Sequence, residues 1–238
     1  MKKNLPTYCV GIDGCKDGWV AVFCPVSSFC KAKVQHYKTL SQLTVDFDTN
    51  SVLIIDMPIG LESNKPNRSC DIEARNFLGH RRSTVFSPPC RDAINSKTYE
   101  EAKAINLKKT NKSISKQSWF LTKKILETQN FINERSGLDL KEGHPECSFA
   151  EYVGTPIAES KKGMIGIFKR LRILTELNFN IPHLVEMVPP SAKIAIDDLF
   201  DAAILCWTAN RLFKGENKTF PSSGLQKKDR KIESFITI

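Results

Sequence analysis

One uninterrupted apolar run, Val52-Leu53-Ile54-Ile55, constrains the fold more than any other feature of the chain. It ends at Asp56 and Pro58, and a short apolar run between polar boundaries is typical of a strand covered on both faces. Three strands are predicted before it, at residues 7–13, 19–24 and 31–37, followed by a short helix at residues 40–47. The order strand, strand, strand, helix, strand predicts an α/β fold with a mixed sheet, in which an antiparallel meander is followed by a parallel crossover.

The remainder of the chain is predicted to be mainly helical. Helices are expected at residues 71–78, from a cap at Ser115 to Arg135, at residues 160–177, and from Pro190 and Ser191 to Lys214, where Gly215 stops the last one. Residues 83–93 and 180–190 are expected to be loops containing prolines, and residues 138–142 a fifth strand with Glu142, His144 and Glu146 at its tip. These elements predict one domain over residues 1–215, with a helical insertion at about 62–136, and a basic tail over residues 216–238.

Length and composition exclude several classes of protein. A chain of 238 residues with 41% apolar and 26% charged residues is expected to be globular, and it has no apolar stretch of the roughly 18 residues that a membrane span needs. The first apolar run meets Asp13 and Gly14 at once, without a cleavage site behind it, so a cytoplasmic protein is predicted. The eight cysteines include no C-x-x-C pair, which favours reduced core residues, with a structural zinc site as the lesser alternative.

The chain is strongly basic. Its 35 Lys and Arg residues outnumber 26 Asp and Glu residues, which gives a formal charge of +9. Basic residues crowd the segments 103–124, 161–172 and 227–231. A basic exterior favours an anionic partner such as nucleic acid. An ordinary lysine-rich surface is the alternative, and charge alone favours that alternative.

Acidic residues stand at the ends of the most apolar segments. They are Asp13, Asp56, Glu142 with Glu146, and Asp198 with Asp201. Burying a carboxylate costs free energy unless a partner compensates it, and hard cations such as Mg²⁺ prefer carboxylate oxygens. We therefore predict a site for Mg²⁺ or Mn²⁺ with Asp13, Asp56, Glu142, Asp198 and Asp201 as ligands, and Asp13, Asp56, Glu146, Asp198 and Asp201 as the catalytic set for two-metal phosphoryl transfer. Each acid alone could equally be a turn or capping residue.

Basic residues are candidates for holding the substrate. Arg81, Arg82 and Arg91 bracket the first proline-containing loop, and arginine can grip phosphate oxygens with two parallel hydrogen bonds. A solvated basic loop is an alternative of equal weight. The predicted substrate-binding residues are Arg81, Arg82, Arg91, Lys116, Gln117, His144 and Lys161.

Seven segments, in order along the chain, match the motifs of a known protein family. They are Gly11-Ile12-Asp13-Gly14-Cys15 with Gly18-Trp19-Val20; Ile55-Asp56-Met57-Pro58-Ile59-Gly60-Leu61; Cys70-Asp71-Ile72-Glu73-Ala74-Arg75; Arg81-Arg82-Ser83-Thr84-Val85-Phe86; Ser115-Lys116-Gln117-Ser118-Trp119; Glu142-Gly143-His144-Pro145-Glu146-Cys147-Ser148-Phe149; and Asp197-Asp198-Leu199-Phe200-Asp201-Ala202-Ala203. Together they resemble the domain of unknown function 429 family, whose members are described as predicted nucleases of the RNase H-like fold.

The resemblance implies three antiparallel strands followed by parallel ones. It places Asp13 on the first strand, Asp56 after the fourth, and the Asp198 and Asp201 pair on a C-terminal helix. Two positions depart from the family pattern, because Asp17 stands where a glycine is usual and Gly143 where a β-branched residue is usual. A glycine at position 143 predicts a looser strand tip beside Glu142.

The leading hypothesis is a metal-dependent nuclease that hydrolyses phosphodiester bonds in nucleic acid. The first alternative is a non-catalytic nucleic-acid-binding protein on the same fold. The second is an ATP-dependent phosphotransferase of the actin-like or sugar kinase type, disfavoured because the turn at Asp13-Gly14 lacks a complete phosphate-loop motif. The choice between DNA and RNA stays open, as does the oligomeric state, with a homodimer as one alternative; no membrane partner is expected.

Overall fold

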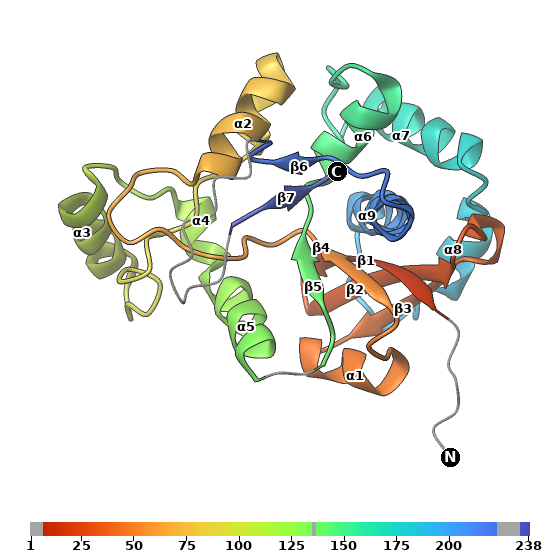
Figure 1. Ribbon diagram of the computed structural model, residues 1–238, viewed down its shortest axis with the longest axis horizontal. Coiled ribbons are helices and arrows are strands. Elements are labelled where there is room, and N and C mark those ends of the chain that lie inside the picture. The colour runs from red at the N-terminus through yellow and green to blue at the C-terminus, as the bar shows by residue number, and fades with distance from the viewer. Residues whose placement is uncertain (1–6, 135–136, 223–233) are drawn as a thin grey trace.

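A mixed sheet of five strands forms the centre of the protein in the computed structural model, which describes residues 7–134, 137–222 and 234–238 (Figure 1). The strands are β1 (Tyr8–Cys15), β2 (Gly18–Pro25), β3 (Lys33–Tyr37), β4 (Val52–Ile55) and β5 (Leu140–Glu142), in the spatial order β3-β2-β1-β4-β5. Strands β1 to β3 pair antiparallel, whereas β4 pairs parallel with β1 and β5 parallel with β4. This arrangement confirms the predicted α/β class and mixed, RNase H-like sheet.

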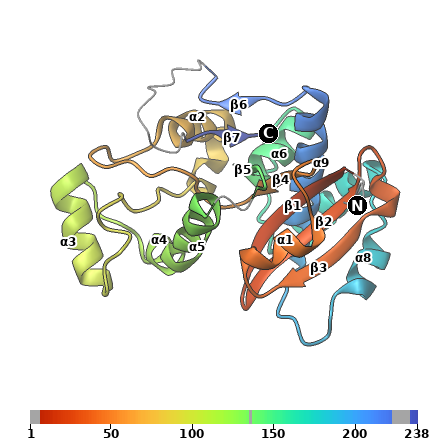
Figure 2. The same cartoon turned by 60° about the horizontal axis from the view of Figure 1, so that its bottom comes forward.

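Helices cover both faces of the sheet. They are α1 (Leu43–Asp46), α2 (Ser69–Leu78), α3 (Tyr99–Thr110), α4 (Lys116–Phe120), α5 (Thr122–Asn133), α6 (Pro145–Val153), α7 (Met164–Glu176), α8 (Ile181–Met187) and α9 (Ile196–Lys214), with short 3₁₀ turns at η1 (Phe29–Lys31), η2 (Leu40–Gln42) and η3 (Gly79–Thr84). Helices α2 to α5 fall within the predicted insertion, and Figure 2 shows α3 and α4 on the side of the molecule opposite β3 and α8. In the described part of the chain, every helix is too short or too polar to cross a membrane.

The two faces of the sheet carry separate apolar cores. Ile54 faces α9 together with Val20 and Val22, whereas Ile55 packs on the opposite face with Ile12 and residues of α1 and α5. This two-sided burial is what the uninterrupted run at residues 52–55 predicts.

Helix α9 lies very close to β1. A Cβ atom added to Gly11 would lie 2.1 Å from the carbonyl oxygen of Ala202, so only glycine permits this approach. Side chains alternate along a strand, and Asp13 therefore lies on the same face as Gly11, toward α9. The contact at Gly11 thus brings the first turns of α9 to the end of β1.

Two predictions that treated proline as a helix breaker are wrong. Residues 180–190 form helix α8 rather than a loop, because Asn180 Oδ1 accepts the His183 N–H and Pro182 occupies the first turn, where its missing N–H costs nothing. Likewise, Pro145 opens α6, which places Glu146 on a helix and not at a strand tip. Helix boundaries also differ. The predicted helix from Ser115 divides into α4 and α5, α7 begins at Met164 instead of residue 160, and the last helix begins at Ile196 instead of residue 190.

The predicted tail contributes to the fold. Strand β6 (Thr219–Phe220) pairs with β7 (Ile236–Thr237), and Ile236 and Ile238 are buried against α2 and α6. Gly143 bridges to Thr237 and donates its N–H to the Ile55 carbonyl at 2.9 Å. A Cβ at Gly143 would lie 2.4 Å from Ile54, so glycine permits this close packing, and the predicted looser strand tip stays a prediction. The basic segment 227–231 and Arg135 lie outside the described residues.

Candidate functional site

Three aspartates from three separate elements converge at one end of the sheet. Asp13 lies in β1, Asp56 follows β4, and Asp201 lies in α9. The parallel register pairs Gly11 with Ile54 and Ile12 with Ile55, so Asp13 and Asp56 are the next neighbours along the two strands. The Asp56 N–H continues the ladder by donating to the Ile12 carbonyl at 2.9 Å. One carboxylate oxygen from each of Asp13, Asp56 and Asp201 lies within 4.8 Å of the other two, and we call this group the aspartate cluster.

Asp13 and Asp201 are buried and Asp56 is partly buried, and removal from water disfavours ionised carboxylates. Asp13 is 7% exposed and Asp201 is 2% exposed. Burial, together with the neighbouring charges of Asp56 and Asp201, raises the pKa of Asp13 well above its ordinary value. Burial also raises the pKa of Asp56 to about 6 and that of Asp201 to about 7, although Lys161 opposes both shifts. The folded protein therefore maintains three acids at close range against their electrostatic preference.

Lys161 supplies part of the missing positive charge. Its ammonium forms an ion pair with Asp201 and lies 3.8 Å from Asp197. Burial alone would lower the pKa of Lys161, but the Asp201 and Asp13 carboxylates outweigh burial and raise it. Among the described residues, Oδ1 of Asp201 is buried without a hydrogen-bond partner. One lysine therefore leaves the aspartate cluster incompletely compensated.

A cavity of about 260 Å³, which we call the acidic cavity, opens onto the aspartate cluster. Glu146 reaches it from α6, and Arg170 holds the carboxylate by donating from Nη2 to Oε1 at 2.6 Å. Arg81 lies 3.8 Å from the same oxygen. The acidic cavity is lined by fifteen described residues. They are Asp13, Gly14, Asp56, Met57, Arg81, Thr84, Phe86, Gln117, Leu121, Lys124, His144, Pro145, Glu146, Lys161 and Asp201. Acidic and basic side chains thus line the same cavity.

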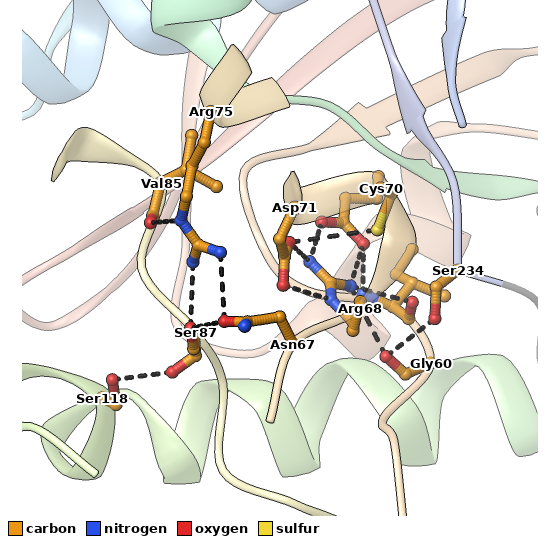
Figure 3. A network of polar contacts seen from close by, with 12 residues as sticks. Gly60, Asn67, Arg68, Cys70, Asp71, Arg75, Val85, Ser87, Ser118 and Ser234 are labelled. Carbon is orange, nitrogen blue, oxygen red and sulfur yellow. Dashed lines mark hydrogen bonds and ion pairs between the residues drawn. The ribbon is translucent and has the colours of Figure 1, made fainter. Parts of the chain in front are cut away.

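Glu142 lies apart from the aspartate cluster, in a buried ion pair with Arg68. Both Glu142 oxygens accept from Arg68 at 2.7 Å, and the Ile59 N–H donates to Oε2 at 2.7 Å. Arg68 also donates to both oxygens of Asp71, as Figure 3 shows. Burial raises the pKa of Glu142 to about 7 despite the Arg68 charge. We call Arg68, Asp71 and Glu142 the arginine network, and its contacts connect α2 to β5.

Asp198 is a capping residue of α9. Its Oδ2 accepts the Ala195 N–H at 3.0 Å, and the side chain is half-buried. Burial raises its pKa, while this hydrogen bond opposes the shift. Of the two helical aspartates in the predicted site, Asp201 lines the acidic cavity and Asp198 does not.

The predicted substrate-binding residues divide between several places. Four of them, Arg81, Gln117, His144 and Lys161, line the acidic cavity. Burial lowers the pKa of His144, whose Nδ1 has no hydrogen-bond partner among the described residues.

The other three lie outside that cavity. Arg82 lines a neighbouring pocket, Arg91 donates to the Leu61 carbonyl at 2.9 Å, and Lys116 is exposed on α4. Arg81 and Arg82, which are neighbours in η3, therefore line two different pockets.

Sequence reasoning did not identify three of the basic residues. Lys124 lines the acidic cavity, where its ammonium lies 4.1 Å from the centre of the Trp19 ring and donates to the Gly18 carbonyl. Arg170 and Arg68 are almost fully buried beside Glu146 and Glu142. Local sequence gives no sign that Arg170 or Arg68 is buried, because Glu146 is 24 residues from Arg170 and Glu142 is 74 residues from Arg68.

The cysteines fit the prediction of reduced thiols. All eight are free, and Cys30 alone is exposed. Cys15, with Asp17 and His36, forms a second group whose possible ligand atoms lie within 4.8 Å of one another. His36 Nε2 lies 3.3 Å from Asp17 Oδ1, so the two form an ion pair when the imidazole is protonated.

The aspartate cluster has the composition of a site for a hard divalent cation. It offers only oxygen donors, from three acids at close range, and it retains the unpartnered Oδ1 of Asp201. Mg²⁺ and Mn²⁺ prefer such ligands, and a bound cation would favour the ionised carboxylates that burial disfavours. The residues present therefore fit a metal ion.

Comparison with known proteins identifies one matching family. No curated protein and no solved structure matches the chain. Residues 11–224 match the model of a family described as protein of unknown function (DUF429), and this segment includes every member of the aspartate cluster. Because the match covers most of its length, the chain belongs to the DUF429 family.

Proposed function

We propose that this protein is a metal-dependent nuclease, which hydrolyses phosphodiester bonds at the aspartate cluster. The convergence of Asp13, Asp56 and Asp201 within 4.8 Å carries the proposal. A purely structural site would pair its buried acids, as the arginine network does. Here the three acids share one lysine, and Oδ1 of Asp201 has no hydrogen-bond partner among the described residues. Acids that converge on a cavity without enough partners are typical of functional sites.

Each residue of the acidic cavity has a role in this proposal. Asp13, Asp56 and Asp201 hold Mg²⁺ or Mn²⁺. When bound, such an ion polarises the phosphodiester and lowers the pKa of a water molecule. Arg170 orients Glu146 toward the cavity, where this carboxylate completes the acidic lining. Arg81 and Lys124 hold the substrate phosphate by its negatively charged oxygens.

Lys161 compensates the aspartate cluster while no cation is bound. Its ammonium contacts Oδ2 of Asp201, whereas Oδ1 has no partner among the described residues and would be available to a cation. The flexible four-carbon side chain of Lys161 lines the acidic cavity, where it could also reach a substrate phosphate.

The proposed substrate is nucleic acid, in agreement with the formal charge of +9, and the proposed location is the cytoplasm. A non-catalytic nucleic-acid-binding protein is the main alternative. The ATP-dependent phosphotransferase gains no support from the acidic cavity, whose basic residues come from separate elements and form no phosphate loop.

Cleavage of a substrate panel tests the proposal. Labelled single-stranded and duplex DNA, RNA, RNA–DNA hybrid and a four-way junction are incubated with Mn²⁺ and either wild type, Asp13→Asn or Asp139→Asn. Asp13→Asn keeps the side-chain shape but removes a ligand charge, whereas Asp139 is 72% exposed and serves as the matched control. We expect cleavage by wild type and the control, and at least a hundredfold loss in Asp13→Asn. Binding without any cleavage by wild type would instead identify the non-catalytic alternative.

A further inference from the structure

A second, larger pocket adjoins the acidic cavity. Its volume is about 640 Å³, and it shares Phe86 and Gln117 with the acidic cavity. The lining includes three cations, Arg75, Arg82 and Lys112, and five serines, Ser83, Ser87, Ser113, Ser115 and Ser118. We call it the basic pocket. Its members come from α2 and the segment before it, from η3 and the loop after it, from α3, and from α4 with the segment that leads into it.

Positive charge in the basic pocket has no acidic partner. None of the described residues that line it is an aspartate or glutamate. Instead, Arg75 and Lys112 share two neutral acceptors. Arg75 donates to Asn67 Oδ1 at 3.1 Å and to Ser87 Oγ at 2.9 Å, and Lys112 donates to the same two atoms at 2.8 and 3.1 Å. Burial and the nearby Arg75 charge lower the pKa of Lys112.

Donors outnumber acceptors in this group. Asn67 Oδ1 accepts from Arg75, from Lys112 and from the Ser87 hydroxyl at 2.9 Å, although an amide oxygen offers only two lone pairs. Arg75 and Lys112 together carry eight N–H groups on their charged ends, so several remain available after these bonds. An oxygen-rich anion in the basic pocket would accept from the surplus donors and compensate both charges.

The basic pocket is held in shape from several sides. Arg75 Nε donates to the Val85 carbonyl at 3.0 Å, and the Ser118 hydroxyl donates to the Ser87 carbonyl at 2.9 Å, which ties α4 to the loop after η3 (Figure 3). The guanidinium is therefore positioned before any ligand arrives. Such preorganisation lowers the entropic cost of binding an anion.

We propose that the basic pocket binds a backbone phosphate of the nucleic acid, one that flanks the phosphodiester at the aspartate cluster. This inference rests on the proposed function. An arginine, a lysine and several hydroxyl groups are suited to the tetrahedral oxygens of a phosphate, and contacts to phosphate position a strand without reading its sequence. The shared residues Phe86 and Gln117 make the two spaces neighbours, so one strand can occupy both.

Salt-dependent binding of fluorescein-labelled twelve-nucleotide DNA and RNA strands tests this inference. Fluorescence anisotropy is measured in EDTA, which prevents cleavage, for wild type, Lys112→Gln, Arg82→Gln and Lys108→Gln. Arg82 and Lys112 are exposed along much of their length, so their substitution leaves the core intact. Lys108 on α3 is exposed, does not line the basic pocket, and provides the matched loss of one charge.

We expect Lys112→Gln and Arg82→Gln each to weaken binding about 3- to 10-fold for every sequence, and to reduce the slope of log K against log salt by about 0.7. Lys108→Gln should match wild type. Equal behaviour of Lys112→Gln, Arg82→Gln and Lys108→Gln would overturn the inference.

Two further measurements separate this inference from neighbouring ones. If inorganic phosphate raises the Tm of wild type but not of Lys112→Gln, while strand binding by the two is equal, the basic pocket holds a small free anion and the assignment to a nucleic-acid strand fails. Mn²⁺-dependent cleavage is then assayed on the same strands. Binding that depends on Lys112, without any cleavage, would support a phosphate site in the basic pocket and contradict nuclease activity. Cleavage that is unchanged in Lys112→Gln and Arg82→Gln would support nuclease activity and contradict the phosphate site.

Discussion

The aspartate cluster and the arginine network both bury acids at the same end of the sheet, but they treat those acids differently. In the arginine network each Glu142 oxygen accepts from Arg68 at 2.7 Å, and a backbone N–H adds a third bond. In the aspartate cluster, Lys161 is the cation that compensates all three carboxylates, although it contacts only Asp201 among them. The Gly14 N–H donates to Asp13 Oδ1 at 2.7 Å, and one oxygen of Asp201 has no partner among the described residues. One group is satisfied within the chain and the other is not.

This difference separates stability from function. A carboxylate whose oxygens are all matched contributes to the geometry of the fold, as Glu142 does by connecting β5 to α2. A group of buried carboxylates without sufficient partners lowers stability, and it persists where a ligand supplies the missing charge. Four predictions test this distinction, in order of decreasing effect.

Breaking the arginine network should have the largest effect on folding. Arg68→Met leaves Glu142 and Asp71 buried without their cation, and we expect the free energy of unfolding to fall by about 3–5 kcal/mol in urea titrations. Arg172→Met is the control, because Arg172 is 73% exposed in a surface pair with Glu176. Equal stability of the two variants would show that the network does not hold the fold.

Removing a charge from the aspartate cluster should raise the free energy of unfolding. Asp56→Asn removes a charge that the fold disfavours, so without metal at pH 8 it should stabilise the protein by about 2 kcal/mol. The same variant should lose any stabilisation by Mn²⁺, as followed by urea unfolding with and without the ion. A less stable Asp56→Asn would mean that Asp56 is satisfied within the chain, contrary to the contrast drawn above.

The pH dependence of stability follows from the raised pKa values of Asp56, about 6, and Asp201, about 7. A raised pKa means that the folded state retains protons which the unfolded state releases near pH 4. The stabilisation is therefore complete below about pH 4 and is lost as the pH rises through 6 and 7. Relative to Asp201→Asn, metal-free wild type should lose about 1–3 kcal/mol between pH 5 and pH 8.

Saturating Mn²⁺ should oppose that loss, because a bound cation favours the ionised carboxylates. Unfolding curves at each pH, with Mn²⁺ or with EDTA, give both results. A difference between wild type and Asp201→Asn that does not change with pH would contradict the raised pKa values.

Substitution of Asp198 should have the smallest effect on the free energy of unfolding. Asp198→Ala removes the bond to the Ala195 N–H, and loss of such a cap costs about 1 kcal/mol. Because Asp198 does not line the acidic cavity, the increase in Tm caused by Mn²⁺ should persist in this variant. Loss of that increase would place Asp198 among the metal ligands, as the sequence alone had suggested.

Much of the fold could be predicted from local pattern. The uninterrupted run at residues 52–55 and the three segments before it predicted the mixed sheet, since burial on two faces and the order of strands leave few topologies. Helices α6 and α8 were not predicted, because Pro145 and Pro182 were taken to break helices, whereas each lies in the first turn of one. The strands in the C-terminal segment were not predicted, because β6 and β7 have only two residues each and give no periodic pattern.

The candidate site was predictable in part. Asp13 is the last residue of the predicted strand 7–13, and Asp56 follows the apolar run at residues 52–55. Strand alternation places both on the face that α9 covers. The choices between Asp198 and Asp201 and between Glu142 and Glu146 depend on how α9 lies on β1 and on which arginine each acid meets. Those partners are distant in sequence, because Arg68 is 74 residues from Glu142, and local pattern does not reveal them.

Calorimetric titration of Mn²⁺ into wild type, Asp201→Asn and Asp139→Asn tests the central claim most directly. Both substitutions make the same chemical change, in the aspartate cluster and at an exposed position respectively. We predict saturable binding by wild type and Asp139→Asn, and at least a tenfold weaker affinity in Asp201→Asn. Equal Mn²⁺ binding by all three proteins, or no binding by wild type, would contradict a metal site at Asp13, Asp56 and Asp201.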